Sequence, residues 1–390
     1  MSRRHSARLA LAATALCAAV PLAAAPPVVP GIPSAEDAPI ALLVDISSGQ
    51  TLFAREDDRR FMPASVTKVM TTFLAFERIA QGKLFPQQLT VMRTETFKLW
   101  HGVGSTMYLA ENTPVSIDAL LHGVTTVSAN DGAVVLSEAA LGSVPAWVAE
   151  MNRTARAIGM RDSHFGTPNG WMDEGHTWMT ARDLATLGGT MITRYPGYYR
   201  HFVGARSLAY NGIAQRNHDP ITGVVAGADG IKTGFTNQAG YGFLGSAQRG
   251  GRRLVMVVAT SPTGRQRDNA ARALMEWGFQ AFDSRFLFPV GAKLADVRVQ
   301  NGGLRHVDAI APRPIRVAMP QGRRPKVTLK VRYDGPIRAP VKQGEKIAEL
   351  AVFFDGKQVS TLPLVARTSI SSASQLQRVF NGIAGWMPWS

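Results

Sequence analysis

The sequence predicts a mixed α/β (α+β) domain in which helices flank an antiparallel sheet, followed by a small all-β domain and a C-terminal amphipathic helix. Residues 36–283 combine expected strands at both ends with amphipathic helices between them, a pattern typical of a sheet that joins both ends of a segment. Residues 284–367 alternate apolar and polar positions between Pro and Gly turns and contain no long helical period. Residues 371–390 place apolar side chains three and four positions apart, as one face of a helix requires.

The first 25 residues are predicted to be a secretory signal peptide. Arginines at residues 3–8 precede an apolar stretch at 9–22, and Ala23–Ala25 supplies the small-residue cleavage pattern. The single cysteine, Cys17, lies inside the apolar stretch. We therefore expect an exported protein whose mature chain has no disulfide, no thiol chemistry and no cysteine-ligated zinc.

Turn residues and hydrophobic periodicity divide the first domain into alternating elements. A hairpin is expected over residues 40–54 with its turn at Ser47–Gln50, and a helix is expected over 65–80. Pro145 and Gly159 bound a further helix, because Pro suits the first helical turn and Gly suits the helix end. The remaining strands are expected at 106–109, 229–234, 240–248 and 254–260, and the remaining helices at 117–124, 132–141, 180–193 and 267–282.

Positive charge is concentrated in the expected second domain. Residues 284–367 carry 16 basic and 6 acidic side chains, whereas residues 26–283 carry 23 basic and 22 acidic ones. A basic segment beside an amphipathic helix attracts anionic lipid, so a membrane surface is the expected partner of this region. A solvated basic surface is the alternative, and the predicted export argues against nucleic acid.

The tail at 371–390 has two interpretations. It is too short and too polar to span a bilayer. It is either a terminal helix docked on the core or an amphipathic helix in a membrane interface, with Trp386 and Trp389 at the level of the headgroups. Its apolar positions are Leu376, Val379, Phe380, Ile383 and Met387.

Ser65 and Lys68 begin the expected helix at 65–80 and form a candidate pair of nucleophile and base. Residues three apart share a helix face, so the hydroxyl and the amine stand side by side. The free N–H groups of a first helical turn also favour a developing anion. A solvated lysine, with a pKa of about 10.4, is a poor base, but a second ammonium at Lys232 lowers the pKa of Lys68. Alone, this pattern fits an ordinary amphipathic helix as well.

Two further motifs give this pair its context. Ser128-Ala129-Asn130 lies in an expected loop, and Lys232-Thr233-Gly234 lies in an expected strand. The ordered set of Ser-x-x-Lys, Ser-x-Asn and Lys-Thr-Gly, at this spacing, is rare by chance. With it, residues 36–390 resemble the penicillin-interacting serine acyl enzymes, most closely the serine-type D-alanyl-D-alanine carboxypeptidases of the penicillin-binding protein 5/6-like family.

The resemblance implies a β-lactamase/DD-peptidase-like fold and roles for the motif residues. Ser65 would be the nucleophile, Lys68 its base, and Ser128 the relay of a proton to the leaving D-alanine nitrogen. No residue clearly activates the water for deacylation, and Lys68 is the candidate for that step too. The resemblance also implies the substrate-binding residues. Asn130 would bind the substrate backbone, and Lys232, Thr233 and Arg265 would bind its terminal carboxylate. Gly234 would allow close approach of the substrate strand, and the N–H of Phe235 would form an oxyanion hole with that of Ser65.

The reaction expected from this resemblance is removal of the terminal D-alanine from peptidoglycan stem peptides ending in D-Ala-D-Ala, with β-lactam antibiotics as covalent inhibitors. The expected location is the periplasmic side of the bacterial inner membrane. A D,D-endopeptidase, a β-lactamase and a non-catalytic penicillin-binding scaffold or sensor are the alternatives. A class A β-lactamase is disfavoured because no Glu-x-x-Leu-Asn pattern lies between Asn130 and Lys232. No cofactor and no metal are expected, since the histidines show no ligand spacing in the sequence.

Overall fold

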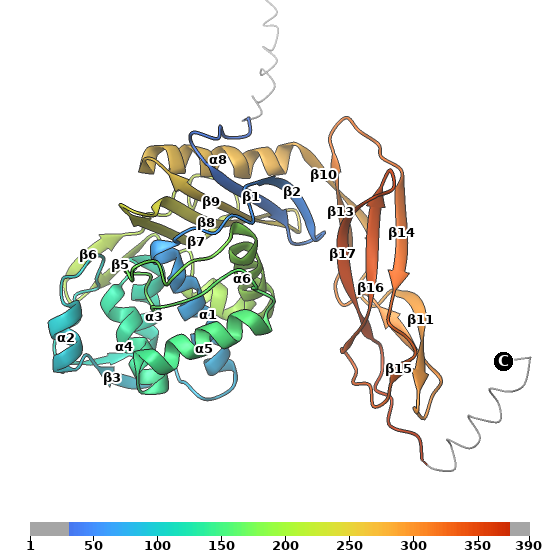
Figure 1. Ribbon diagram of the computed structural model, residues 1–390, viewed down its shortest axis with the longest axis horizontal. Helices are drawn as coiled ribbons and strands as arrows, with labels where there is room; N and C mark the ends of the chain where they lie inside the picture. The colour runs from blue at the N-terminus through green and yellow to red at the C-terminus, as the bar shows by residue number, and fades with distance from the viewer. Residues whose placement is uncertain (1–30, 375–390) are drawn as a thin grey trace, which may run out of the picture.

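The computed structural model describes residues 31–374. The expected signal peptide and nearly all of the expected amphipathic helix at 371–390 therefore lie outside the described residues. The described chain forms a mixed helix–sheet domain and an elongated all-β domain beside it (Figure 1). The predicted fold class of both domains is confirmed.

The first domain is built on a five-stranded antiparallel sheet. The strand order is β2-β1-β9-β8-β7, so the hairpin from the start of the domain pairs with strands from its end. In the register between β1 and β9, Leu42 lies opposite Val257. The strands are β1 (Ile40–Asp45), β2 (Gln50–Arg55), β7 (Ala228–Thr236), β8 (Gly240–Arg249) and β9 (Arg252–Ser261).

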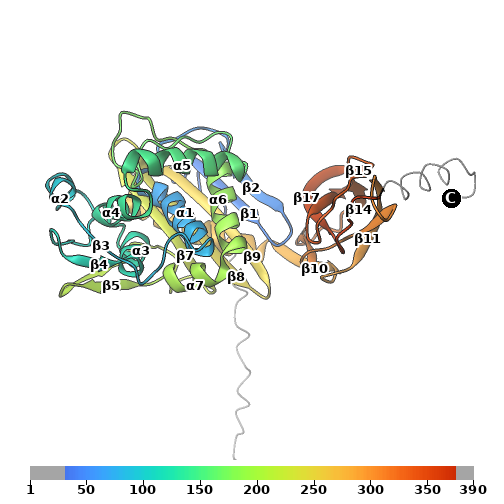
Figure 2. The same ribbon diagram turned by 90° about the horizontal axis from the view of Figure 1, so that it is seen from below.

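Helices cover both faces of this sheet. Helix α8 (Gly264–Gln280) lies on one face, and α1 (Lys68–Ala80) and α6 (Ala181–Arg194) lie on the other (Figures 1 and 2). Successive residues of β1 divide between the two cores: Ile40 and Leu42 belong to the core on the α1 side, whereas Ala41 and Leu43 belong to the core on the α8 side. This two-sided burial explains why β1 is a continuous apolar run rather than an alternating one.

A helical lobe extends from the α1 side. Helix α3 begins at Ser116, whose hydroxyl accepts a hydrogen bond from the Ala119 N–H at 3.1 Å, and α6 begins at Thr180 in the same way, with the Asp183 N–H at 3.1 Å. Among residues 31–374 no single helix is long and apolar enough to cross a membrane, and one pair that meets those criteria together, α4 with α5, is bent by 86°. The helices of the lobe are α2 (Thr94–Trp100), α3 (Ile117–Thr126), α4 (Asn130–Leu141), α5 (Val144–Ala157) and α7 (Pro196–Phe202).

The expected strand at 106–109 is wrong. The backbone N–H groups of Met107 and Leu109 donate to the carboxylate of Asp131 at 3.0 and 3.1 Å instead of joining a sheet ladder. Side-chain capture of backbone donors competes with strand pairing.

Several elements without a strong periodic signal were not predicted: helices α2 and α7, and the pairs β3 (Leu89–Val91) with β4 (Pro114–Ser116) and β5 (Ser207–Tyr210) with β6 (Ile213–Arg216).

The second domain contains strands around a third hydrophobic core. Its main sheet has the order β14-β16-β17-β12-β11-β15, and β10 pairs with β13. The boundary expected at 283/284 falls inside β10, which begins at Phe282 directly after α8. The strands are β10 (Phe282–Phe288), β11 (Lys293–Gln300), β12 (His306–Ile310), β13 (Ile315–Pro320), β14 (Val327–Arg332), β15 (Ile337–Arg338), β16 (Lys346–Phe354) and β17 (Lys357–Ala366).

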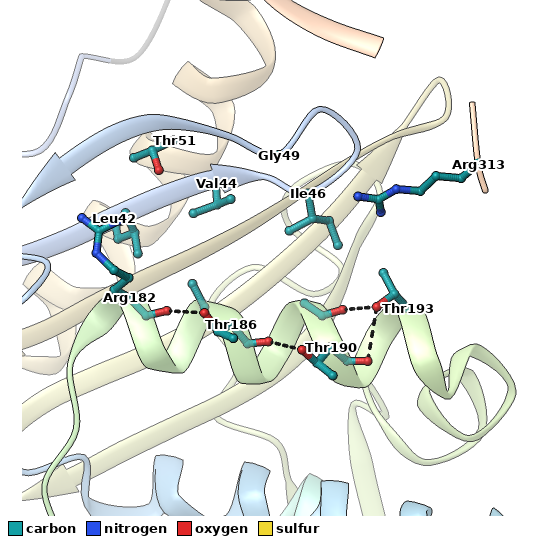
Figure 3. Close-up of a pocket in the computed structure, with 12 residues that line it drawn as sticks. Leu42, Val44, Ile46, Gly49, Thr51, Arg182, Thr186, Thr190, Thr193 and Arg313 are labelled. Atoms are coloured by element: carbon teal, nitrogen blue, oxygen red, sulfur yellow. Dashed lines mark hydrogen bonds between the residues drawn. The ribbon is translucent and has the colours of Figure 1, made fainter. Parts of the chain in front are cut away.

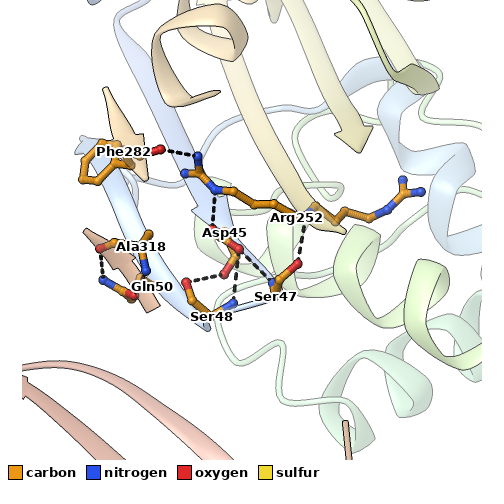
Figure 4. Close-up of polar contacts among 8 residues, drawn as sticks. Asp45, Ser47, Ser48, Gln50, Arg252, Phe282 and Ala318 are labelled. Atoms are coloured by element: carbon orange, nitrogen blue, oxygen red, sulfur yellow. Dashed lines mark hydrogen bonds and ion pairs between the residues drawn. The ribbon is translucent and has the colours of Figure 1, made fainter. Parts of the chain in front are cut away.

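Buried polar side chains connect the two domains at the β1–β2 turn (Figure 4). The Gln50 amide donates to the carbonyl of Ala318 at 3.0 Å and accepts from its N–H at 2.6 Å, so it bonds β13 like a sheet neighbour. The buried Arg252 guanidinium donates to Asp45 at 2.7 Å and to the carbonyl of Phe282 at 2.8 Å. These bonds fix the start of the second domain on the sheet of the first.

A groove of about 350 Å³ runs between β1 and α6, close to this junction (Figure 3). The threonines of α6 that line it, Thr186 and Thr190 among them, donate their hydroxyl protons to backbone carbonyls one turn earlier. Arg313 reaches into the groove from the second domain. The residues that line it include none of the predicted site residues.

Candidate active site

Ser65 lies in a single turn of 3-10 helix, Ala64–Thr67, that leads directly into α1. The tighter turn places the Ser65 hydroxyl 2.9 Å from the amine of Lys68, the first residue of α1. Val66 and Val69 anchor this turn in the core. The expected pair is therefore formed, at the point where a helix offers free N–H groups.

Lys68 is fully buried, and three polar groups surround its amine. Besides Ser65, these are the side-chain oxygen of Asn130 and the carbonyl oxygen of Asn169, both at 2.7 Å. Burial lowers the pKa of Lys68 well below its usual value, the positive charge of Lys232 lowers it further, and Asp131 partly opposes both. The sequence indicates the charge of Lys232 as the cause of a low Lys68 pKa, but burial is the larger cause. A neutral amine beside a serine hydroxyl can accept its proton.

Ser128 and Ala129 lie between α3 and α4, and Asn130, the first residue of α4, contacts Lys68. Ser128 has a positive φ of 64°, an uncommon conformation for a residue other than Gly, and its buried hydroxyl has no hydrogen-bond partner among the described residues. Asn130 accepts from Lys68 and donates to the carbonyl of Val103 at 3.0 Å. Asn130 thus orients the base, a role that the sequence argument did not assign to it.

The loop at 163–176 supplies a contact that sequence reasoning missed. Its Asn169 carbonyl binds Lys68, and its Pro168 carbonyl accepts from the Thr71 hydroxyl at 2.6 Å. Gly170 lies so close to the turn of Ser65 that a Cβ atom there would be 1.9 Å from the carbonyl oxygen of Ala64. Any residue can supply a backbone carbonyl, so residue identity gives no signal for this contact.

Strand β7 forms the opposite wall. It is an edge strand of the five-stranded sheet, and among residues 31–374 it pairs only with β8. Gly234 lies against the Ser65 turn, because a Cβ atom there would be 2.5 Å from the Pro63 carbonyl oxygen. Thr233 precedes Gly234 on the same strand. The exposed Phe235 ring stacks on the Tyr241 ring, with 4.1 Å between the ring centroids. The free edge of β7 can therefore pair with an extended substrate strand.

Lys232 is 5% exposed and donates a hydrogen bond to the Thr233 carbonyl at 3.0 Å. Burial, reinforced by the positive charge of Arg267 and opposed by Asp219, lowers the pKa of Lys232 to about 7. Two buried lysines and an arginine thus share one site. The Arg267 guanidinium also contacts the Asp268 carboxylate at 2.5 Å, and together with Lys232 it supplies positive charge that can bind a substrate carboxylate.

The two arginines at the start of α8 differ in burial. Arg265 is exposed in the first turn of α8. Arg267, two positions later, is buried, donates to the Gly242 carbonyl at 3.2 Å, and acts on the pKa of Lys232. The reason is where α8 starts. The Thr263 hydroxyl caps the helix by accepting a hydrogen bond from the Gln266 N–H at 3.2 Å. A helix that starts at this point turns Arg267, rather than Arg265, toward the sheet.

These contacts define a class of enzyme. A buried lysine of low pKa contacts a serine hydroxyl at a helix start, with a second lysine near the edge of a sheet. The arrangement is that of a serine acyl-transfer enzyme that acts on a carbonyl and recognises a neighbouring negative charge.

Comparison with known proteins identifies the family. The model of the D-alanyl-D-alanine carboxypeptidase family matches residues 28–263, and the model of the penicillin-binding protein 5 C-terminal domain matches residues 282–372. The chain belongs to the D-alanyl-D-alanine carboxypeptidase family and is a serine hydrolase, as predicted.

Relatives of known function match over most of their length. The D-alanyl-D-alanine carboxypeptidase DacA of Escherichia coli K12 is 30% identical over 98% of this chain and 96% of its own. Penicillin-binding protein 5 of Haemophilus influenzae has a crystal structure with a TM-score of 0.72 and 30% identity, over 87% of this chain and 99% of that one. Penicillin-binding protein D2 of Listeria monocytogenes, solved in its ampicillin-bound form, is 28% identical over 63% of this chain and 98% of that one, with a TM-score of 0.57.

Proposed function

We propose that this protein removes the terminal D-alanine from peptidoglycan pentapeptides through an acyl-enzyme on Ser65, and that penicillins acylate the same serine. The observation that carries the proposal is the 2.9 Å contact between the Ser65 hydroxyl and the buried, low-pKa amine of Lys68. The relatives named D-alanyl-D-alanine carboxypeptidase and the ampicillin-bound relative support the substrate and the inhibitor class.

Acylation starts with proton transfer from Ser65 to the neutral amine of Lys68. The serine oxygen attacks the carbonyl of the penultimate D-alanine, and the N–H groups of Ser65 and Phe235 stabilise the oxyanion that forms. The C–N bond breaks as Ser128 passes a proton from Lys68 to the departing nitrogen. Free D-alanine leaves, and an ester on Ser65 remains. Water, deprotonated by Lys68, then hydrolyses the ester and regenerates the serine.

The terminal carboxylate of the substrate is assigned to Lys232, Thr233 and Arg267. Arg267 replaces Arg265 in this assignment, because it is the arginine whose charge acts on Lys232. The substrate strand approaches β7 at Gly234, where the missing side chain leaves room.

The test compares penicillin labelling with D-alanine release. We expect fluorescent penicillin to form a stable adduct, the Ser65→Ala variant to form none, and the Ser284→Ala variant, altered at an exposed serine of β10, to react normally. Purified protein should release D-alanine from a pentapeptide ending in D-Ala-D-Ala. Cleavage of cross-linked dimers alone would indicate an endopeptidase, and rapid loss of the adduct would indicate a β-lactamase. Labelling without any hydrolysis would indicate a scaffold or sensor.

The location is part of the proposal. We infer that the protein is exported, and that residues 371–390 bind the periplasmic surface of the inner membrane, because of their apolar spacing and their tryptophans. The exposed basic side chains of β14, Lys330 and Arg332, support contact with anionic lipid. Deleting residues 374–390 should release the protein from membranes without loss of labelling at Ser65. Unchanged membrane fractionation would contradict the anchor.

A further inference from the structure

We propose that Asp118, His122 and His201 form a surface site for one divalent transition-metal ion of the Zn²⁺ type, separate from the serine site. Asp118 and His122 lie one turn apart on α3, and His201, which follows Asp118 by 83 positions, comes from α7. The spacing between the histidines in the sequence predicted no metal site. The informative signal was the Asp-x-x-x-His pattern on a helix face.

The three side chains already converge. An oxygen of the Asp118 carboxylate is 3.2 Å from Nε2 of His201, and its other oxygen is 3.9 Å from Nε2 of His122. The two imidazole rings lie edge to face, with 5.2 Å between centroids and an interplanar angle of 66°. All three ligand atoms lie within 4.8 Å of one another. Tetrahedral ligands about 2.0–2.1 Å from zinc are roughly 3.4 Å apart, so small side-chain rotations complete the site.

Solvent can reach this site, and its chemistry selects the type of ion. The side chains of Asp118, His122 and His201 are 42%, 25% and 58% exposed, so an ion can enter and water can fill a fourth position. Two imidazoles with one carboxylate suit Zn²⁺, Ni²⁺ or Cu²⁺, whereas Mg²⁺ and Ca²⁺ prefer sites made of oxygen ligands. A single histidine would be enough to form a hydrogen bond with Asp118. In this structure the Asp118 carboxylate has one oxygen near His201 and the other near His122.

Binding would join α3 to α7. The two helices already meet beside the cluster, where the Thr125 hydroxyl donates to the Phe202 carbonyl at 2.6 Å, and the His122 ring lies 5.0 Å from the Phe202 ring. Since the ion binds only the folded arrangement, it raises the free energy of unfolding. Among residues 31–374, no hydrogen bond or ion pair joins its ligands to Ser65, Lys68 or Lys232, and we assign the ion a structural role at the contact of α3 with α7.

The test uses untagged full-length protein, freed of metal with EDTA and titrated with ZnCl₂ by calorimetry. We expect the unchanged protein to bind one Zn²⁺ per chain. The His201→Ala and Asp118→Asn variants should bind Zn²⁺ at least about tenfold more weakly. His306→Ala, which alters an exposed histidine of the second domain, is the matched control and should bind like the unchanged protein. At free Zn²⁺ of about 100 times Kd, the Tm should rise by about 5 °C, and this rise should vanish in His201→Ala.

Two results would overturn the proposal: no zinc binding, or equal zinc binding in His201→Ala and His306→Ala. Visible absorption of the Co²⁺ form provides a second readout, because only ligation by the cluster makes the Co²⁺ bands depend on His201. The Tm measured in EDTA shows whether each variant is folded. His122→Gln, a smaller change inside the same cluster, repeats the test if His201→Ala is unfolded. Penicillin labelling of Ser65 with and without Zn²⁺ should be equal, which separates this outcome from that of the proposed function.

Discussion

Replacement of Gly170 by Ala tests how the loop at 163–176 positions the catalytic pair. Gly170 has a φ of +71°, and a Cβ atom there would lie 1.9 Å from the carbonyl oxygen of Ala64 and 2.6 Å from the hydroxyl of Thr67. Real Cβ atoms essentially never approach closer than 3.0 Å. The loop and the Ser65 turn must therefore separate by more than about 1 Å to accept one methyl group.

This separation acts directly on Lys68. The Asn169 carbonyl, one residue before Gly170, is 2.7 Å from the Lys68 amine, and a shift of about 1 Å breaks that contact. The amine then leaves its position 2.9 Å from the Ser65 hydroxyl. A 1 Å misplacement of a reacting group costs on the order of 100-fold in rate. We expect Gly170→Ala to slow acylation of Ser65 by about that factor.

Gly175→Ala is the matched control for backbone strain. Gly175 belongs to the same loop and has a φ of +85°, but no atom lies within 4 Å of its Cβ position. Both variants meet the cost of a left-handed alanine, about 1–2 kcal/mol. Only Gly170→Ala adds the clash, so the difference between the two variants isolates the positioning of the loop.

The assay is the second-order rate constant for labelling by fluorescent penicillin, measured below the Tm of each variant. The positioning argument requires Gly175→Ala to label within about threefold of the unchanged protein. Equal rates for the two variants at matched folded fraction would refute it. A slow rate in both variants would show that loop strain, rather than the contact with Ala64, controls the site.

Three further predictions follow from charge and burial. The kcat/KM for D-alanine release should fall at low pH as Lys68 gains a proton, and at high pH as Lys232 loses one with a pKa of about 7. Lys232→Arg should move only the alkaline limb upward, and an unmoved limb would contradict the assignment. Arg267→Ala should raise KM about tenfold or more, with Arg265→Ala within twofold; the reverse order in steady-state kinetics would restore Arg265. Asp131→Asn should lower the free energy of unfolding by about 3 kcal/mol, because the buried carboxylate accepts three backbone N–H groups; an unchanged urea midpoint would contradict this.

The catalytic motifs could be predicted because their geometry is local. Ser65 and Lys68 are three residues apart, so helical periodicity alone brings them together. Ser128 and Lys232 required only the recognition that three short motifs occur in order. The caps of α3 and α6, Ser116 and Thr180, are local side-chain contacts of the same kind.

The missed features depend on contacts between distant segments or on the phase of a helix. Asn169 contributes a backbone carbonyl, and Met107 donates a backbone N–H to Asp131, and neither property belongs to a residue type. Arg265 was named from the resemblance, and the expected helix began only at residue 267, so the burial of Arg267 was not predicted. The Thr263-x-x-Gln266 capping pattern marks the earlier start and would have corrected the phase.

The order of the causes acting on Lys68 separates the duties of the two lysines. Burial is the main cause of its low pKa, and Lys232 only adds to it, so Lys68 remains a usable base even if Lys232 loses its charge. Lys232, with a pKa of about 7, is only partly charged near neutral pH. A substrate carboxylate beside it would raise its pKa and restore its proton, while burial keeps the pKa of Lys68 low and so favours proton transfer from Ser65. Binding of the correct substrate would thus complete the charge pattern that its own cleavage requires.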